Sequence, residues 1–213
     1  SRPKIKNKQI SKDGTIKWLL ELEDKNLVET VYIPSNTHST LCISSQVGCT
    51  LNCKFCHTGV QPLVKNLSSN EIINQIMVAK GELDDWGEQK KINNIVYMGM
   101  GEPFYNYENI KKSVQILKDE NGLNFSNKKI TISTSGISPN IKKAGDEIGT
   151  YLALSLHASN DEIRNSIMPI NKKYNIQDII NHCNEYAKKN NEKIFIEYVL
   201  LKDVNDSEQC AKE

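Results

Sequence analysis

Three cysteines within one short stretch constrain this chain more than any other feature. Cys49, Cys53 and Cys56 are separated by three and two residues, so a single loop carries all three thiols. Thiolates at this spacing can wrap one corner of a cubane iron–sulfur cluster and leave its fourth iron without a protein ligand. That open iron can bind a small molecule. The loop therefore predicts a [4Fe-4S] cluster that works with a second cofactor.

A zinc site is the alternative for the same residues. Cys49, Cys53, Cys56 and His57 are all common zinc ligands. However, the adjacent Cys56 and His57 would have difficulty reaching one metal, and structural zinc sites commonly combine two separated ligand pairs. The sequence contains no second Cys-x-x-Cys or His-x-x-x-His pair. We therefore favour the cluster and keep a zinc-bound, non-catalytic RNA-binding module as the other hypothesis.

The composition is that of a globular protein without a strong charge bias. Of 213 residues, 38% are hydrophobic, and 27 Lys+Arg against 26 Asp+Glu give a net charge of +1. RNA contacts would have to come from local patches such as Lys4, Lys6 and Lys8, or Lys172 and Lys173. No apolar run is long enough for a membrane span, and the lysine-bearing start is unlike a secretory signal. With six cysteines in this context, we expect reduced thiols, a cytoplasmic location and no membrane partner.

The residue pattern changes near residue 40. Residues 1–40 contain a turn at Lys12-Asp13-Gly14 and apolar-rich strands at 15–22 and 27–33, which predicts a small β meander. From residue 41 onward, expected strands alternate with amphipathic helices that begin near residues 68, 107, 138, 160 and 176. These strands lie at 41–44, 94–98, 130–135, 151–157 and 194–201. We expect an N-terminal β appendage of residues 1–40 and a main domain of residues 41–213.

The alternation of apolar strands with helices predicts an α/β fold with a parallel sheet covered by helices. Polar motifs follow the strands at the cysteine loop and at 99–103, 133–136 and 155–157. Barrels built from (βα) units place their chemistry at these strand ends. A Gly-x-Gly-x-x-Gly turn of the dinucleotide-binding type does not follow the first parallel strand. We therefore predict a partial (βα) barrel of the TIM type, open at the C-terminal end of the chain.

Polar residues at the strand ends are candidates for binding the second cofactor. In the 99–103 turn, glycines allow close approach of the backbone to a ligand, and Glu102 could accept from an ammonium group. Ser133 and Ser135 share one face of their strand, and Ser155 shares a face with His157. These groups could bind a ribose or a carboxylate. The alternatives are a solvated glutamate in an ordinary turn and polar strand ends bonded to neighbouring loops.

Several segments together resemble the RlmN/Cfr family of radical S-adenosylmethionine (SAM) RNA methyltransferases, and they are closer to the RlmN branch. In chain order, these segments are 28–34, 42–49, 98–103, 133–136, 155–158, 168–171 and 197–199. The cysteine loop, with Phe55 before its third cysteine, resembles the radical SAM signature. The resemblance implies a radical SAM barrel that binds a [4Fe-4S] cluster and SAM.

The resemblance also implies a reaction. It is methylation of carbon 2 of an adenine in 23S rRNA, and in some members in tRNA, with an electron donor such as flavodoxin or ferredoxin. Methylation of carbon 8, as in the Cfr branch, is the alternative. Carbon 2 has no nucleophilic electrons to offer, so radical chemistry is needed. In the family, one SAM methylates a cysteine near the C-terminus, and a radical from a second SAM activates that methyl group for addition to the adenine. The resulting protein–RNA crosslink is then resolved.

Functional positions of the family carry over onto this sequence one by one. Cys49, Cys53 and Cys56 match the cluster ligands. The positions that match SAM contacts are Gly101, Glu102, Ser133, Ser155, Leu156 and His157. Glu29 matches the carboxylate proposed as proton acceptor, and Cys42 resembles a second cysteine that takes part in resolving the crosslink. Judged by its own surroundings in the sequence, Glu29 would be a solvent-facing strand residue and Cys42 a small core side chain.

One departure from the family pattern matters. The methyl-carrying cysteine of the family lies in a Cys-Gly-Gln-Leu motif, which does not occur here, and neither Cys183 nor Cys210 matches it. A late SAM-binding asparagine and an N-terminal RNA-binding region are also unmatched. The sequence starts at Ser1 and stops just after the start of an expected helix. We therefore expect a piece of a longer protein that holds a cluster and binds SAM weakly, but does not turn over.

Overall fold

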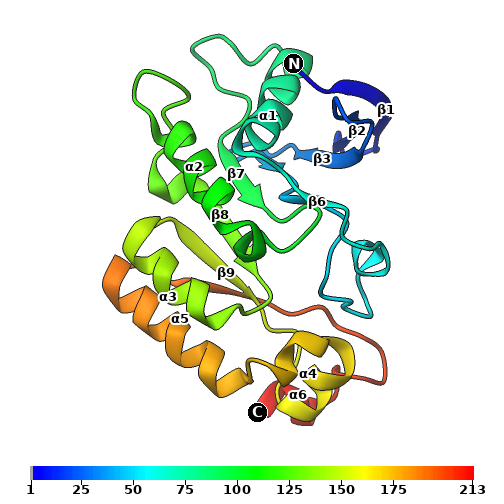
Figure 1. Ribbon diagram of the computed structural model, residues 1–213, viewed down its shortest axis with the longest axis vertical. Coiled ribbons are helices and arrows are strands. Elements are labelled where there is room, and N and C mark those ends of the chain that lie inside the picture. The colour runs from blue at the N-terminus through cyan, green and yellow to red at the C-terminus, as the bar shows by residue number, and fades with distance from the viewer. Residues whose placement is uncertain (1) are drawn as a thin grey trace.

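One eight-stranded sheet forms the centre of the protein in a computed structural model that describes residues 2–213 (Figure 1). The strand order is β1-β2-β3-β4-β7-β8-β9-β10. The strands are Lys4–Ile10 (β1), Ile16–Glu21 (β2), Leu27–Ile33 (β3), Thr40–Cys42 (β4), Asn94–Tyr97 (β7), Ile130–Thr134 (β8), Tyr151–Ser155 (β9) and Ile194–Glu197 (β10). Pairing is antiparallel from β1 to β4 and parallel from β4 to β10. The predicted α/β fold class with a parallel sheet is confirmed.

Helices follow each of the parallel strands. They are α1 (Ser69–Leu83), α2 (Tyr107–Lys118), α3 (Ser138–Glu147), α4 (Asp161–Ile167), α5 (Ile176–Asn190) and α6 (Glu208–Lys212), with 3-10 turns η1 (His57–Val60), η2 (Pro103–Asn106), η3 (Asn127–Lys129) and η4 (Pro169–Lys172). In Figure 1, α2, α3 and α5 lie on one side of the strands, and the cyan loop that follows β4 extends on the other. None of the helices between residues 2 and 213 has both the length and the apolar character needed to cross a membrane.

The hydrophobic core lies between the helices and the strand residues that face them. Leu41 pairs in register with Ile95, and Tyr97 pairs with Ile132. All four are at most 1% exposed. The helices contribute further buried side chains: Ile72, Ile76, Ile110, Val114, Leu117, Ile141 and Ile179. Removing this apolar layer from water is the main favourable contribution to folding.

Residues of the other parity share the opposite face of the sheet. Cys42 on β4 pairs in register with Val96, and Ser155 on β9 pairs with Glu197 on β10. Ser133 on β8 pairs with Ala153, two residues before Ser155. Because strand side chains alternate between faces, the polar side chains at these strand ends point to the same side. We call this side, away from α2, α3 and α5, the open face.

The N-terminal strands extend the main sheet, because β3 pairs with β4. β2 and β3 confirm the two strands expected there. The apolar pattern does not predict β1, since all seven of its residues are exposed and no apolar face marks it. β1 forms by pairing with β2 alone. The boundary between an appendage and a main domain near residue 40 stays a prediction.

Local chemistry explains where two helices start. A capping box marks the start of α1: the Ser68 hydroxyl accepts from the Glu71 backbone N–H (3.2 Å), and the Glu71 carboxylate accepts from the Ser68 N–H (2.9 Å). The expected start of α3 near residue 138 is confirmed. Ile137 is the cap residue of α3, and Ser138 begins the helix, with proline in its first turn. Proline is tolerated there because the first N–H groups have no partner within the helix.

A buried amide joins the N-terminal strands to the main sheet. In α1, Gln75 Oε1 accepts from Thr30 Oγ1 and from the Ser44 backbone N–H, both at 2.9 Å. Its Nε2 donates to the Ser44 carbonyl oxygen at 2.9 Å. Gln75 is fully buried. One side chain therefore links β3, the end of β4 and α1 without leaving a polar group unsatisfied.

Replacing this amide tests its contribution to stability. Gln75→Leu leaves the backbone N–H and carbonyl of Ser44 buried without partners, so we expect the free energy of unfolding to fall by about 2–4 kcal/mol. Urea denaturation measures the change. Gln177→Leu, at an exposed position of α5, is the matched control, and we expect a change within about 0.5 kcal/mol. Equal effects of the two substitutions would contradict the role of Gln75.

Candidate active site

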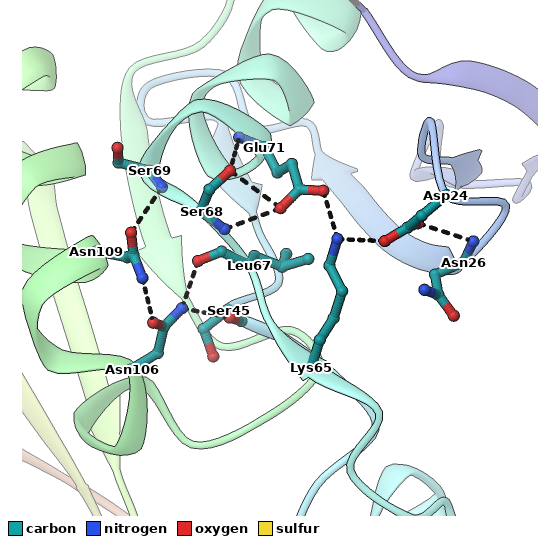
Figure 2. Close-up of polar contacts among 10 residues, drawn as sticks. All are labelled: Asp24, Asn26, Ser45, Lys65, Leu67, Ser68, Ser69, Glu71, Asn106 and Asn109. Carbon is teal, nitrogen blue, oxygen red and sulfur yellow. Dashed lines mark hydrogen bonds and ion pairs between the residues drawn. The ribbon is translucent and has the colours of Figure 1, made fainter.

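The cysteine loop leaves the sheet after β4 and returns at α1. Its two ends meet at the short strands β5 (Gln46–Val47) and β6 (Lys65–Asn66). One amide then holds both ends: Asn106 Nδ2 donates to the carbonyl oxygens of Ser45 (2.8 Å) and Leu67 (2.7 Å), as Figure 2 shows. Asn106 is 3% exposed. A single buried side chain therefore satisfies both carbonyl groups and closes the neck of the loop.

Further polar contacts fix this neck to the surrounding elements (Figure 2). Asn109 Nδ2 donates to Asn106 Oδ1 at 2.8 Å and so orients the clamping amide. Lys65 Nζ bonds Glu71 Oε1 at 2.7 Å and also pairs with Asp24. The neck is therefore tied to α1, α2 and the turn between β2 and β3.

Backbone contacts shape the loop itself. Gly48 has φ +75°, and a Cβ atom at this position would overlap the carbonyl oxygen of Pro62. Only glycine satisfies both conditions. Farther along the loop, the Lys54 backbone N–H donates to the carbonyl oxygen of Ile167 at 2.9 Å. The end of α4 therefore supports the segment that carries the cysteines.

The three predicted cluster ligands line one cavity of about 130 Å³. Residues from the cysteine loop and from the strand ends line it together: Cys49, Cys53, Cys56, Gly101, Ser135, Ser155 and His157. His57, the fourth ligand of the zinc hypothesis, is not a lining residue. Among residues 2–213, no three His, Cys, Asp or Glu side chains are arranged as a metal site. Thiols lose their protons when they bind a metal ion, and sites of this kind are commonly not preformed. The sulfurs therefore come into coordinating positions as the metal binds.

The chemistry of these thiols suits an iron–sulfur cluster. Burial raises the pKa of Cys49, and burial together with neighbouring groups that can carry negative charge raises that of Cys53 to about 12. Both side chains are less than a tenth exposed. Soft sulfur donors in a largely apolar pocket favour iron–sulfur clusters, and three of them leave a coordination position for another ligand.

A second cavity, of about 150 Å³, adjoins the first and shares residues of the β7 loop, β8 and β9 with it. The Glu197 carboxylate at the end of β10 accepts from Ser133 Oγ (3.1 Å) and Ser155 Oγ (3.2 Å), and the two hydroxyl oxygens are 3.4 Å apart. These three side chains form a polar wall on the open face. A carboxylate beside two hydroxyls can bind an ammonium group or the hydroxyls of a sugar.

Glu102 also lines the second cavity, but its carboxylate already has protein partners. Oε1 accepts from the Phe104 N–H (3.0 Å) and Thr134 Oγ1 (2.8 Å), and Oε2 accepts from the Ser135 N–H (2.8 Å). Burial raises the pKa of Glu102, whereas these donors lower it. Glu102 therefore joins the β7 loop to the end of β8. A contact between its carboxylate and SAM stays a prediction.

The two other residues predicted near SAM differ in placement. His157 lines the cysteine cavity, where its ring contacts Phe55 edge-on at 4.8 Å and its Nδ1 accepts from the Val199 N–H at 3.0 Å. Burial, assisted by the positive charge of Arg164, lowers the pKa of His157 to about 4, so the imidazole is neutral at pH 7. The side chain of Leu156 lines a different pocket, beside α5 and α6. The structure does not bring that side chain to the cysteines.

Glu29 and Cys42 lie on the open face. Cys42 pairs in register with Val31, which lies two residues after Glu29, so the three side chains point to the same side. Burial raises the pKa of Cys42 to about 11, and the negative charge of Glu197 adds to this rise. Glu29 forms an ion pair with Lys17 (2.9 Å) and remains partly exposed. Their catalytic roles stay predictions.

Sequence reasoning missed three residues that shape the site. Glu197 carried a signal, because it is an acidic residue inside the near-continuously apolar stretch 194–201. Asn106 carried none, since its partners lie far away along the chain. Arg164 looked like an ordinary helix residue, yet it is fully buried and donates to the carbonyl oxygens of Ser135 and Ser155.

Comparisons with known proteins give a consistent result. Residues 43–211 match the family model described as the Radical SAM superfamily. The dual-specificity RNA methyltransferase RlmN of Bradyrhizobium sp. (strain ORS 278) is 51% identical over 99% of this chain and 56% of its own length. The RlmN of Rhodospirillum rubrum is 51% identical over 100% of this chain and 51% of its own length. The chain spans about half the length of these curated relatives. The crystal structure of a radical SAM methyltransferase from Sphaerobacter thermophilus matches with a TM-score of 0.94 and 39% identity, over 100% of this chain and 62% of that one.

Removing the clamp at the neck should loosen the cysteine loop. Asn106→Leu leaves the Leu67 carbonyl without a donor and the Ser45 carbonyl with the Leu67 N–H alone, so we expect a loss of about 1–3 kcal/mol in the free energy of unfolding. Hydrogen exchange of residues 45–67 should accelerate by about tenfold or more, because opening the neck becomes easier. Asn181→Leu, at an exposed position of α5, is the control and should leave exchange in the loop unchanged. Unchanged loop protection in Asn106→Leu would contradict the clamp.

The buried imidazole predicts a pH dependence of stability. The pKa of His157 is about 4 in the folded protein, against an ordinary value of 6.5. The unfolded chain therefore takes up a proton between these values that the folded protein does not. The resulting stability is present above pH 6.5 and is lost as the pH falls toward 4, by at most roughly 3 kcal/mol.

Urea denaturation of wild type and His157→Gln at several pH values from 4 to 7.5 measures this contribution. Relative to wild type, the variant should lose less stability as the pH falls. Parallel curves for the two proteins would show that His157 contributes nothing to the pH dependence.

Proposed function

The chain belongs to the Radical SAM superfamily, and from this premise we propose that it provides the catalytic core of an RNA methyltransferase acting on carbon 2 of adenine. Membership of the superfamily implies a [4Fe-4S] cluster and SAM as cofactors. The observation that carries the proposal is the junction of the two cavities: three thiols, two of them buried, line one, and a carboxylate with two hydroxyls lines the other. A cluster ligand set and a polar cofactor site therefore adjoin on the same edge of the sheet.

In this proposal, each part of the site has a distinct task. Cys49, Cys53 and Cys56 hold the cluster. The polar wall of Ser133, Ser155 and Glu197 binds the polar groups of SAM, and Gly101 and His157 line its approach to the thiols. When bound, the cluster supplies the electron that splits the sulfonium of SAM and so opens a radical route. Apolar residues around the thiols, such as Leu51 and Met168, exclude water from this chemistry.

Two further residues act on the open face in this proposal. Cys42 shares that face with the polar wall, and its half-buried thiol, whose pKa is raised to about 11, is neutral at pH 7. Glu29 is the proposed proton acceptor, and Lys17 at 2.9 Å holds its carboxylate at the edge of the open face. In the final step, Glu29 would take up the proton and Cys42 would take part in resolving the crosslink.

The relatives support the choice of substrate. Their names describe dual-specificity RNA methyltransferases, and the sequence identity extends over essentially the whole of this chain. We propose adenines of 23S rRNA and tRNA as substrates and a flavodoxin or ferredoxin as electron donor. We also propose a cytoplasmic location, since all six cysteines are free thiols and a cluster of this kind needs a reducing compartment.

Anaerobic reconstitution tests the cofactor site. The chain should turn brown, absorb broadly in the visible range and, with a strong reductant, convert SAM to 5′-deoxyadenosine and methionine. Cys53→Ala should reduce cluster content and SAM cleavage to background, because the cluster loses one of three ligands. Cys210→Ala removes a thiol outside the cysteine cavity and should retain both properties. A colourless zinc protein, or SAM cleavage unaffected by Cys53→Ala, would overturn the proposal.

Mass spectrometry of digested RNA tests the reaction. The 213 residues contain no Cys-Gly-Gln-Leu motif, so we expect SAM cleavage without methylation of unmodified 23S rRNA. Fusion to the N- and C-terminal segments of the Rhodospirillum rubrum relative that this chain does not match should produce 2-methyladenosine. Formation of 8-methyladenosine by the fusion would assign the Cfr-like reaction instead. Methylation by the unfused chain would refute the need for that motif.

A further inference from the structure

Arg164 in α4 is a fully buried cation whose hydrogen-bond partners are all neutral. Its guanidinium donates to the carbonyl oxygens of Leu156 (2.9 Å), Ser135 (2.7 Å) and Ser155 (3.0 Å) and to Asn171 Oδ1 (2.8 Å). These bonds give each guanidinium nitrogen an acceptor but do not balance its charge. A buried charge is costly unless a charge of opposite sign lies nearby.

The nearby carboxylate does not supply that balance directly. Asp161 Oδ1 accepts from Asn171 Nδ2 at 2.8 Å, so the amide of Asn171 stands between the carboxylate and the guanidinium. Asp161 is exposed to solvent, and water screens its charge. The positive charge of Arg164 is therefore largely uncompensated by the side chains bonded around it.

Arg164 lies directly behind the two cavities of the active site. Two of its acceptors, Ser135 and Ser155, line both cavities. Its helix also supports the cysteine loop, because the Ile167 carbonyl accepts from the Lys54 N–H. Cys53 belongs to the same buried cluster as Ile167 and Met168, which are the last residue of α4 and the residue after it.

We propose that Arg164 is the fixed counter-charge of the iron–sulfur site. The inference rests on the proposed function, because it requires the cluster at the three cysteines. An oxidised cubane core carries two positive charges, so three thiolates leave the site with a net negative charge, and reduction adds another. The electron comes from the external donor, and no bond or proton of Arg164 changes. Four hydrogen bonds hold the guanidinium in place, so its charge cannot move away from the cluster cavity.

The consequence is a shift in the reduction potential. A buried cation stabilises the reduced cluster more than the oxidised one, because the reduced form carries more negative charge in a low-dielectric site. Net charge and hydrogen bonding around a cluster are established determinants of its potential. Arg164 is therefore a positioning residue with an electrostatic effect. It makes the electron transfer that precedes SAM cleavage less unfavourable.

A redox titration of the reconstituted protein, followed by electron paramagnetic resonance without SAM, tests the proposal. Arg164→Gln removes the charge, so its midpoint potential should become more negative than that of wild type. Arg164→Lys keeps the charge and should stay closer to wild type, although it loses hydrogen bonds. Lys142→Gln removes an exposed charge on α3 and should leave the potential unchanged. Equal potentials for wild type and Arg164→Gln would overturn the proposal.

A second variant covers the case in which Arg164→Gln does not hold a cluster. The double variant Asp161→Asn/Asn171→Asp exchanges the amide and the carboxylate, which places the carboxylate directly on the guanidinium at constant net charge, so the potential should again become more negative although Arg164 is retained. If Arg164→Gln holds no cluster and the double variant has the wild-type potential, Arg164 has only a structural role and the proposal fails. Absence of a cluster from the wild-type protein would instead defeat the proposed function, which distinguishes the two failures.

Discussion

One buried amide, that of Asn106, determines where the three thiols lie. A long loop is entropically free to place its cysteines in many positions, and that freedom must be removed before a metal site can exist. The Asn106 side chain joins the two carbonyl groups at the neck, and the pairing of β5 with β6 continues the closure. Support from α4 then fixes the far end of the loop. The cysteine cavity follows from these few contacts rather than from contacts among the cysteines.

The parallel sheet supplies the second half of the site. Register places Ser155 opposite Glu197, and Ser133 reaches the same carboxylate from the next strand. Glu102 on one side and Arg164 behind then bind the backbone at the ends of β8 and β9. Every polar group named here is satisfied by a partner, and such networks hold side chains in one arrangement. The proposed cofactor site is therefore preorganised by hydrogen bonds between strands that lie far apart in the sequence.

How much could be predicted from the sequence depended on whether the signal was local. Apolar patterns located the five parallel strands, β2, β3 and the main helices, and the cysteine spacing located the predicted cluster ligands. β1 has no apolar face, and β5 and β6 have two residues each, so no pattern marks them. Ser133, Ser155 and His157 were expected at the site because they lie at strand ends, and all three line the cavities. The side chain of Leu156 lies in another pocket.

The remaining site features depend on contacts between distant segments. Arg164 contacts the ends of β8 and β9, and Asn106 contacts residues on both sides of the cysteine loop. An arginine or asparagine in a helix or turn usually faces solvent, so composition and spacing give no reason to place either residue inside. Only the packing of α4 and η2 against the sheet shows that they are buried.

Burial of the cysteine thiols has a consequence for how the protein survives before it receives iron. With their pKa values raised, Cys49 and Cys53 stay in the thiol form at neutral pH. Oxidants and disulfides react with thiolates rather than thiols, so these two cysteines react slowly with either. In the proposed cluster site, iron–sulfur insertion releases their protons into the surrounding buffer. Maturation of the protein is thereby coupled to proton release and is favoured in mildly alkaline solution.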